Sequence, residues 1–171
     1  MTRKIRFSTM AAALLLLVAC GYRFTSGGQL PGGVSSIAVD MFTNRTVETG
    51  IETYFTSDLV YELTRSGRVN VLPANEAEAV LHGVIVTVLE KTISRKDVTV
   101  AQSRRVYVTL DLKMMDRSGR IVWARRKLTD NETYQVDNAS GLDSASNKRE
   151  AIRIISRRMA ENIYKDMTDE F

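Results

Sequence analysis

The sequence has one cysteine and one histidine, and this scarcity excludes several kinds of site. Cys20 has no second cysteine with which to form an intrachain disulfide, and one residue of each type cannot build a zinc site of the Cys/His kind. A Ser-His-Asp triad would have to use His82, which lies in the strand-like segment 79–84 and is better explained as a packed or edge-strand residue. No phosphate-binding loop, dinucleotide fingerprint or calcium-loop spacing occurs either. We therefore expect a protein that is not an enzyme and that holds no metal or other cofactor.

The sequence also lacks a hydrophobic run long enough to span a bilayer, and it has a short apolar run near the start. A basic stretch, with Arg3, Lys4 and Arg6, is followed by apolar residues from 11 to 19. That run is far shorter than the roughly 20 residues that span a bilayer. The pattern is typical of a secretory signal peptide, which we place at residues 1–19.

The end of this segment, Leu-Val-Ala-Cys at residues 17–20, resembles the lipobox of bacterial lipoproteins. The resemblance implies cleavage before Cys20, diacylglycerol on its thiol and an acyl chain such as palmitate on its new amino group. The residue after Cys20 is Gly21. An Asp at this position signals retention in the inner membrane, so the glycine favours the outer membrane. We expect a lipid-anchored protein on the periplasmic face of that membrane. The alternative is an ordinary secretory signal with a cysteine after it by chance.

The basic excess of the whole sequence comes mostly from the signal. The chain has 24 basic and 20 acidic residues, and removal of Arg3, Lys4 and Arg6 leaves 21 basic residues against 20 acidic ones. The mature chain is therefore nearly neutral, and its charge does not indicate nucleic-acid binding. Residues 20–34, with glycine pairs around Pro31, predict a tether, and residues 35–171 are enough for one domain.

Two segments carry apolar residues at helical spacing. Thr49 and Glu52 predict a capping box at the start of the first helix, and Gly67 is expected to end it. The second helix is expected to begin between Ser144 and Asn147, with a box-like start at Asn147 and Glu150. The residues expected to face the core are Ile51, Phe55, Leu59 and Leu63 in the first helix, and Ile152, Ile155, Met159, Ile163 and Met167 in the second.

The remaining segments predict strands. Residues 36–40 and 68–72 are short apolar runs, residues 80–89 form a long β-branched run, and residues 106–114 alternate apolar and polar side chains. A turn at 116–119 leads into a return strand that begins at Ile121. Because neither amphipathic helix can bury its stripe alone, the order β-α-β-β-β-β-α predicts an α/β (α+β) fold. We expect a two-layer sandwich, with a mixed sheet of four to five strands and both helices on one face.

Basic residues gather in the middle of the chain. Residues 84–127 hold 11 basic and 4 acidic residues, whereas the flanking parts of the mature chain contain more acidic than basic residues. Clusters of this kind bind phosphates through charge-assisted hydrogen bonds, and lipopolysaccharide is the abundant polyanion at the outer membrane. The alternative is a solvated hairpin surface, charged for solubility. These basic residues are predicted to lie at strand ends and turns, where loops at one end of a sheet can bring several of them together: Lys91, Arg95, Lys96, Arg104, Arg105, Arg117, Arg120, Arg125, Arg126 and Lys127.

Segments near the amino end resemble a known family. Cys-Gly-Tyr-Arg-Phe at 20–24, Leu-Pro-Gly-Gly-Val at 30–34, Ile-Ala-Val at 37–39 and Phe-Thr-Asn-Arg-Thr at 42–46 look like the opening of the lipopolysaccharide-assembly lipoprotein family (LptE-like). The rest of the domain matches that family by its pattern of helices and strands.

This resemblance implies a lipoprotein that plugs the large outer-membrane β-barrel which inserts lipopolysaccharide, and that assists the assembly of this barrel. It also implies direct contact with lipopolysaccharide through basic residues near the strand-loop end of the sheet. Arg95, Lys96, Arg104 and Arg105 occupy that region, without a one-to-one alignment.

A second family shares the early β-α-β layout. Residues 37–45, followed by an amphipathic helix, also resemble periplasmic lipoproteins related to the TolB amino-terminal domain, which include activators of peptidoglycan synthases and subunits of secretion channels. The Cys-Gly-Tyr-Arg-Phe opening and the short tether favour the first resemblance.

Overall fold

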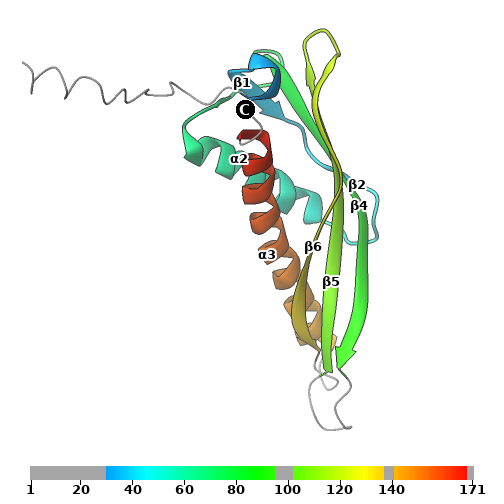
Figure 1. The fold of residues 1–171 in the computed structure, drawn as a ribbon. Helices are drawn as coiled ribbons and strands as arrows, with labels where there is room; N and C mark the ends of the chain where they lie inside the picture. Colours follow the sequence, from blue (N-terminus) through cyan, green and yellow to red (C-terminus); the bar gives the residue numbers. More distant parts are fainter. Residues whose placement is uncertain (1–29, 95–101, 137–140, 169–171) are drawn as a thin grey trace, which may run out of the picture.

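The computed structural model describes residues 30–94, 102–136 and 141–168 of the 171-residue chain. A mixed sheet forms one layer and two helices form the other, so the predicted two-layer class is confirmed (Figure 1). Cys20, Arg95 and Lys96 lie outside the described residues. The elements are η1 (Pro31–Gly33), β1 (Ser36–Val39), β2 (Thr43–Asn44), α2 (Ile51–Ser66), β3 (Asn70–Val71), β4 (Ala79–Ser94), β5 (Gln102–Asp116), β6 (Ile121–Val136) and α3 (Gly141–Thr168).

The sheet has the order β3-β1-β4-β5-β6, and β2 pairs with β4 beside β1. β1 is parallel to both β3 and β4, whereas β4, β5 and β6 form an antiparallel meander. The sheet therefore has six strands, where the sequence predicts four to five. The additional strand, β2, consists of Thr43 and Asn44 alone, which is too short to give a periodic signal.

Both helices lie on the same face of the sheet, as expected. Every residue predicted to face the core is buried, from Ile51 to Leu63 in α2 and from Ile152 to Met167 in α3. They pack against alternate residues of β5, among them Val108 and Leu110. The apolar stripes of α2 and α3 are both buried against the sheet, because each would otherwise face water, and this burial holds the helix layer on the sheet layer.

The ends of the helices follow the prediction in one place and depart from it in two. Gly67 ends α2 with φ of 63°, and its N–H donates to the Thr64 carbonyl at 3.2 Å. The predicted capping box is wrong, because Gly50 is the N-cap residue and makes no side-chain cap bond. Glu52 instead accepts a hydrogen bond from Nδ2 of Asn44, at 2.9 Å.

The start of α3 also differs from the prediction. The helix begins at Gly141, ahead of the predicted start between Ser144 and Asn147. Asn147 lies inside the helix, and its Nδ2 donates to the Gln135 carbonyl of β6 at 3.0 Å. The side chain that suggested a helix start is therefore a tertiary contact between α3 and the sheet.

An aromatic contact joins β4 to α2 across the core. Phe42, between β1 and β2, lies against Gly83 of β4, where an added Cβ would collide with the ring. The Phe42 ring also stacks on Phe55 of α2, with ring centroids 6.2 Å apart. Glycine is required at position 83 because the ring occupies the space of a side chain.

Part of the predicted tether belongs to the packed domain. Leu30 and Val34 are buried in the main core, and η1 between them lies against β6, with Gly32 close to Val122. Residues 30–34, which the sequence places in the tether, therefore pack with the domain.

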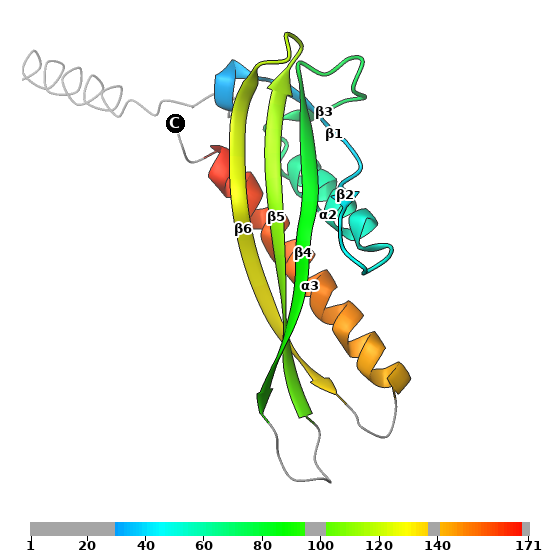
Figure 2. The ribbon, with the colours of Figure 1, turned by 90° about the vertical axis from the view of Figure 1, so that its right-hand side faces the viewer.

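The helices leave the other face of the sheet uncovered. In Figure 2 this open face is turned to the viewer, with α3 behind it, and the long strands β4, β5 and β6 continue beyond the short strands β1 and β2. Neither helix in the described ranges is both long and apolar enough to span a bilayer.

Candidate functional site

The structure separates the two predicted site residues that it describes. Arg104 and Arg105 are neighbours on β5, and successive strand residues point to opposite faces. Arg104 is on the helix-covered side with buried Val106, and Arg105 is on the open face with Tyr107. The predicted cluster of four therefore has at most three members on one face, and the positions of Arg95 and Lys96 lie outside the described residues.

Arg104 belongs to a polar network under the helix. Its Nη1 lies 3.6 Å from Oε2 of Glu90, and Tyr134 donates a short hydrogen bond to the same carboxylate oxygen. Nζ of Lys148, on α3, lies 2.5 Å from Glu90 and 2.5 Å from Glu48. The network therefore joins β4, β5, β6 and α3 to the loop before α2.

The charges of this network fix the protonation states of its members. Burial opposes ionisation of Glu90, but the hydrogen bonds from Lys148 and Tyr134 outweigh it and hold the pKa of Glu90 below its ordinary value. Burial, together with the Glu90 carboxylate, raises the pKa of Tyr134 to about 12. Arg104 is engaged with an ionised carboxylate, which weakens it as a candidate for binding an external anion.

Arg105 has different surroundings on the open face. It lies directly opposite Lys91 of β4 in register, and its Nε donates to Oγ1 of Thr133 on β6 at 3.2 Å. Nζ of Lys91 stands 5.3 Å from the ring centroid of Tyr107. Within 30–94, 102–136 and 141–168, neither Lys91 nor Arg105 forms an ion pair with a carboxylate.

Lys91 is thus a site residue that the sequence prediction left out of its set of four. It appears in the wider basic cluster, but its position beside Arg105 depends on the register between β4 and β5. That register contains an irregularity between Ile85 and Thr87, so counting along the sequence alone would not have paired the two cations.

Several other cations of the predicted cluster contribute to the structure. Arg117 donates to the carbonyls of Ala77 and Glu76 at 2.9 and 2.7 Å, and Arg120 pairs with Asp116 at 3.0 Å. These residues flank the β5–β6 turn, at the end of the meander opposite to Arg104. β5 has 15 residues, which at about 3.3 Å each puts the two ends roughly 50 Å apart. One site cannot include both groups.

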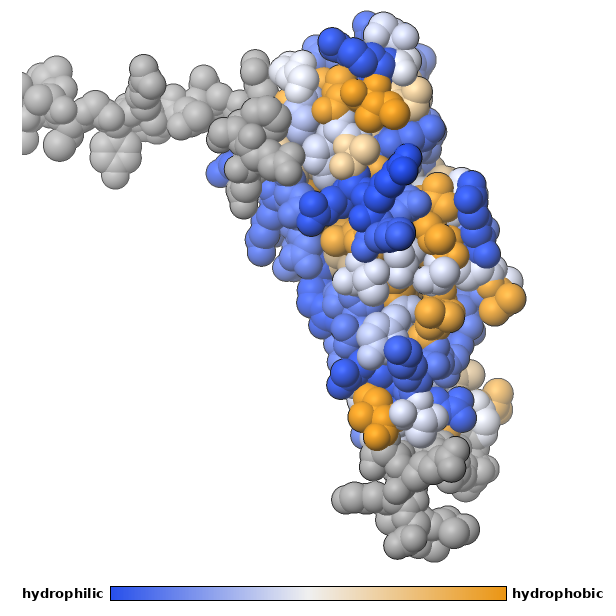
Figure 3. All heavy atoms as spheres, turned by 45° about the vertical axis from the view of Figure 1, so that its right-hand side comes forward, coloured by the Kyte–Doolittle hydropathy of each residue, from blue (hydrophilic) through white to orange (hydrophobic). Residues whose placement is uncertain are grey.

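The open face also presents apolar side chains. Figure 3 shows hydrophobic patches between hydrophilic residues on the face that is turned forward. Near Lys91, the side chains of Leu89 and Ile93 are 56% and 47% exposed. The surface around the cations is therefore amphipathic.

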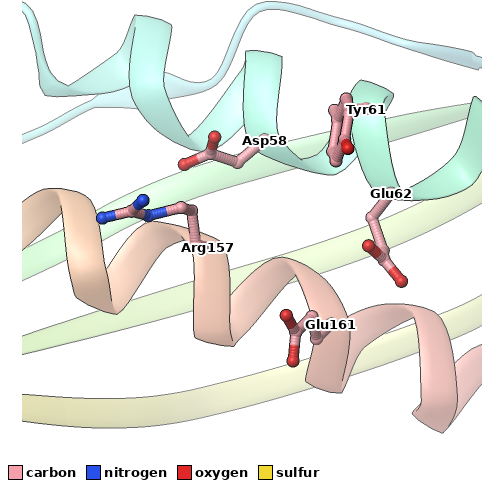
Figure 4. A pocket seen from close by; sticks show the side chains of 5 residues that line it. All are labelled: Asp58, Tyr61, Glu62, Arg157 and Glu161. Carbon is pink, nitrogen blue, oxygen red and sulfur yellow. The ribbon is translucent and has the colours of Figure 1, made fainter. Parts of the chain in front are cut away.

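A second candidate is a pocket of about 290 Å³ between α2 and α3 (Figure 4). Its lining combines three carboxylates with one guanidinium and one phenol. These residues do not include a nucleophile placed beside a general base, so the pocket does not indicate a catalytic site. The lining residues are Asp58, Tyr61 and Glu62 from α2, and Arg157 and Glu161 from α3.

His82 sits on the open face of β4, as the strand prediction implies. Its Nδ1 lies 2.9 Å from Oδ2 of Asp40, and its side chain is 36% exposed. No hydroxyl group in the described part of the chain hydrogen-bonds to it, so the third member of a triad is missing there.

Comparison with known proteins identifies the family. The model of the family described as "LptE: Lipopolysaccharide-assembly" matches residues 34–167, which is most of the chain. No curated protein matches. The fold is similar to that of a minor lipoprotein from Acinetobacter baumannii, at 20% identity with a TM-score of 0.59, covering 80% of this chain and 92% of the other.

An uncharacterized lipoprotein B from Nitrosomonas europaea has a similar fold, at 13% identity with a TM-score of 0.59, covering 86% of this chain and 90% of the other. At these identities the two structures support the fold alone. The family match covers both the candidate cations and the helices that support their strands, and it agrees with the resemblance seen in the sequence. The chain belongs to the LptE lipopolysaccharide-assembly family.

Proposed function

We propose that this family member is an outer-membrane lipoprotein, anchored by lipid on Cys20, that helps to assemble and then plugs the barrel which inserts lipopolysaccharide. It binds lipopolysaccharide directly through Lys91 and Arg105 and catalyses no reaction. Family membership supports the general role in lipopolysaccharide assembly. The observation that carries the binding role is the pair of cations on the open face, without a carboxylate partner among the described residues.

Two like charges directly opposite each other in a sheet are unfavourable, because their side chains are only about 5 Å apart at Cβ. A phosphate group between Lys91 and Arg105 would replace this repulsion by two charge-assisted contacts. The Thr133 hydroxyl and the Tyr107 ring already restrain the two cations, so less side-chain freedom is lost when an anion binds.

The apolar neighbours favour an amphipathic anion. Exposed Leu89 and Ile93 flank Lys91 in the sequence, so a ligand with phosphates and acyl chains would contact both kinds of side chain. Lipid A of lipopolysaccharide has both features. A nucleic acid offers phosphates without acyl chains and is a poorer fit.

The barrel role is supported by the surface and by the anchor. Polar and charged side chains dominate the exposed residues of the strands and helices, which suits a water-filled barrel interior. A lipid on Cys20 would hold the domain at the inner leaflet and raise its effective concentration near a barrel in the same membrane.

A charge-reversal experiment tests the binding role. The double variant Lys91→Glu with Arg105→Glu is compared with Lys113→Glu and Arg126→Glu, which makes the same change of charge at exposed positions nearer the other end of the meander. Binding of fluorescent lipopolysaccharide to the lipidated protein in detergent should weaken at least about tenfold in the first variant and much less in the second. Equal losses, or no loss in the first variant, would contradict the assignment.

The barrel role is tested by affinity purification of the lipidated protein from outer membranes, with co-purifying proteins identified by mass spectrometry. A large β-barrel protein in stoichiometric amount is the expected result. A peptidoglycan synthase or a secretion channel in its place would favour the TolB-like alternative.

A further inference from the structure

The long meander has two free edges, and they differ in how they are protected. On one side, β4 pairs with β1 as far as Leu81 and with β2 as far as Ile85, where the N–H of Arg45 donates to the Ile85 carbonyl at 3.0 Å. From residue 86 to residue 94, β4 has β5 as its single strand partner within the described ranges. On the other side, β6 is an edge strand along its whole length.

The β6 edge is occupied by side chains from α3. Nη2 of Arg158 donates to the Asn131 carbonyl at 2.6 Å, and Nδ2 of Asn147 donates to the Gln135 carbonyl at 3.0 Å. Lys127 adopts a positive φ of 55° at an irregularity in the strand. Bulges, charges and covered backbone groups are the devices by which proteins prevent an edge strand from pairing with another chain.

The exposed part of β4 has irregularities at Val86 and Ile93 and carries the charges of Glu90 and Lys91, but it differs from β6 in its backbone, which no described side chain covers. Its residues 86–94 read Val-Thr-Val-Leu-Glu-Lys-Thr-Ile-Ser, rich in β-branched side chains and free of proline. No side chain from the described part of the molecule hydrogen-bonds to the backbone of this segment. It therefore keeps a row of backbone donors and acceptors that a further strand can use.

We propose that residues 86–94 are a docking edge, to which an extended segment of a partner protein adds as a strand with carboxylates on the open-face side. The charge of this edge selects the partner. Lys91 and Arg105 lie on the open face without a carboxylate partner in the described ranges, whereas Glu90, on the helix side, is already neutralised by Lys148. A strand beside β4 would place a side chain about 5 Å from Lys91, so an acidic residue there is favoured.

A second copy of this chain fits the edge poorly. Two copies paired along 86–94 would bring two Lys91–Arg105 pairs together in one sheet, and like charges at cross-strand distances are destabilising. The inference does not depend on the barrel or on lipopolysaccharide, since it rests on backbone groups and charges of β4 that are present in either case.

The test uses the lipidated full chain in detergent with a synthetic peptide, acetyl-Thr-Val-Thr-Glu-Thr-Val-Thr-Glu-Thr-amide, whose valines and glutamates share one face of a strand. Two control peptides carry lysine in place of both glutamates, or proline in place of the central threonine. Hydrogen–deuterium exchange followed by mass spectrometry should show slower exchange of 86–94, by at least about tenfold, with the acidic peptide alone. Exchange of β6 should not change.

A charge swap makes the test sharper. The variant Lys91→Glu with Arg105→Glu should lose protection by the acidic peptide and gain it with the lysine peptide, while a circular dichroism melt checks that the variant is folded. Lack of protection at 86–94, equal protection by the acidic and lysine peptides, or protection of β6 instead would overturn the proposal. Protection without any peptide that grows with protein concentration, together with a dimer in sedimentation, would assign the edge to a second copy and overturn it as well.

Discussion

Arg158 of α3 holds Asp130 of β6 through two hydrogen bonds, from Nε to Oδ2 at 2.7 Å and from Nη2 to Oδ1 at 3.0 Å. The same guanidinium donates from Nη1 to Glu132 at 2.9 Å and from Nη2 to the Asn131 carbonyl. Hydrogen bonds to Asp130 and then Glu132 raise the pKa of Arg158 further above its already high value. One side chain therefore fixes α3 to three successive residues of the sheet edge.

Replacement of Arg158 by alanine should destabilise the protein by about 1–2 kcal/mol, because it leaves Asp130 and Glu132 as two neighbouring, partly buried carboxylates. The figure is modest because the Arg158 side chain is 40% exposed and solvent screens its charge. Chemical denaturation measures the change. Arg149→Ala, at an exposed position on the same helix, is the matched control and should stay within about 0.5 kcal/mol of the parent.

Glu90 should contribute to the acid limb of the stability curve. Its pKa is lowered in the folded protein, so the stability that it contributes is fully present above the ordinary glutamate value of 4.5 and is lost as the pH falls through the lowered value. Below pH 4.5 the Glu90→Gln variant should therefore lose stability less steeply with falling pH than the parent does. Denaturant titrations between neutral and acidic pH measure this slope, with Glu76→Gln as the control. An unchanged slope would show that Lys148 does not stabilise the ionised carboxylate.

Gly83→Ala should destabilise the core by about 1–3 kcal/mol, because the added methyl group would collide with the Phe42 ring. The second variant Phe42→Leu should recover part of this loss when combined with Gly83→Ala, since it removes the ring that the methyl group meets. Gly141→Ala is the control, because an added Cβ there meets no atom within 4 Å. Thermal unfolding of the single and double variants completes the cycle, and purely additive losses would contradict the contact.

Arg104 and Arg105 should respond differently to the same substitution. Arg105→Ala should weaken lipopolysaccharide binding about threefold to tenfold and leave the melting temperature nearly unchanged, since its one described hydrogen bond is to the exposed Thr133. Arg104→Ala should lower the melting temperature and have the smaller effect on binding, because Arg104 faces Glu90. If both variants lose binding equally, the division of roles between the two faces of β5 is wrong.

The lipid anchor has its own test. The amino-terminal peptide of the protein from outer membranes should begin at Cys20 and carry the mass of diacylglycerol and an acyl chain. Gly21→Asp should move the protein to the inner membrane without a change in that mass. A peptide that begins elsewhere, or that lacks the added mass, would favour the ordinary secretory signal.

The two helices could be predicted closely because their signals are local. The four-residue spacing from Ile51 to Leu63 and the glycine at position 67 depend on the chain itself, and the structure confirms both. The starts were harder, since Asn44 binds the Glu52 side chain and Asn147 reaches β6. Each of these side chains forms a tertiary hydrogen bond that the local sequence does not predict.

The candidate site was predicted less well, for a related reason. Strand β5 was expected from the apolar alternation that begins at Val106, whereas it begins at Gln102. The polar residues before Val106 join the strand because β4 and β6 on either side supply hydrogen bonds to their backbone. Without that extension, Arg104 and Arg105 look like one loop cluster rather than residues of opposite faces.

The sequence by itself determined the family, the two buried helical stripes and the concentration of cations between residues 84 and 127, because each follows from the order and spacing of residue types. The tertiary structure alone decided that Lys91 stands beside Arg105 and that Arg104 turns to Glu90. It also decided that side chains of α3 cover backbone groups of β6, whereas no described side chain covers those at the end of β4. The physical reason is that register, bulges and edge contacts are set by hydrogen bonds between segments far apart in the chain.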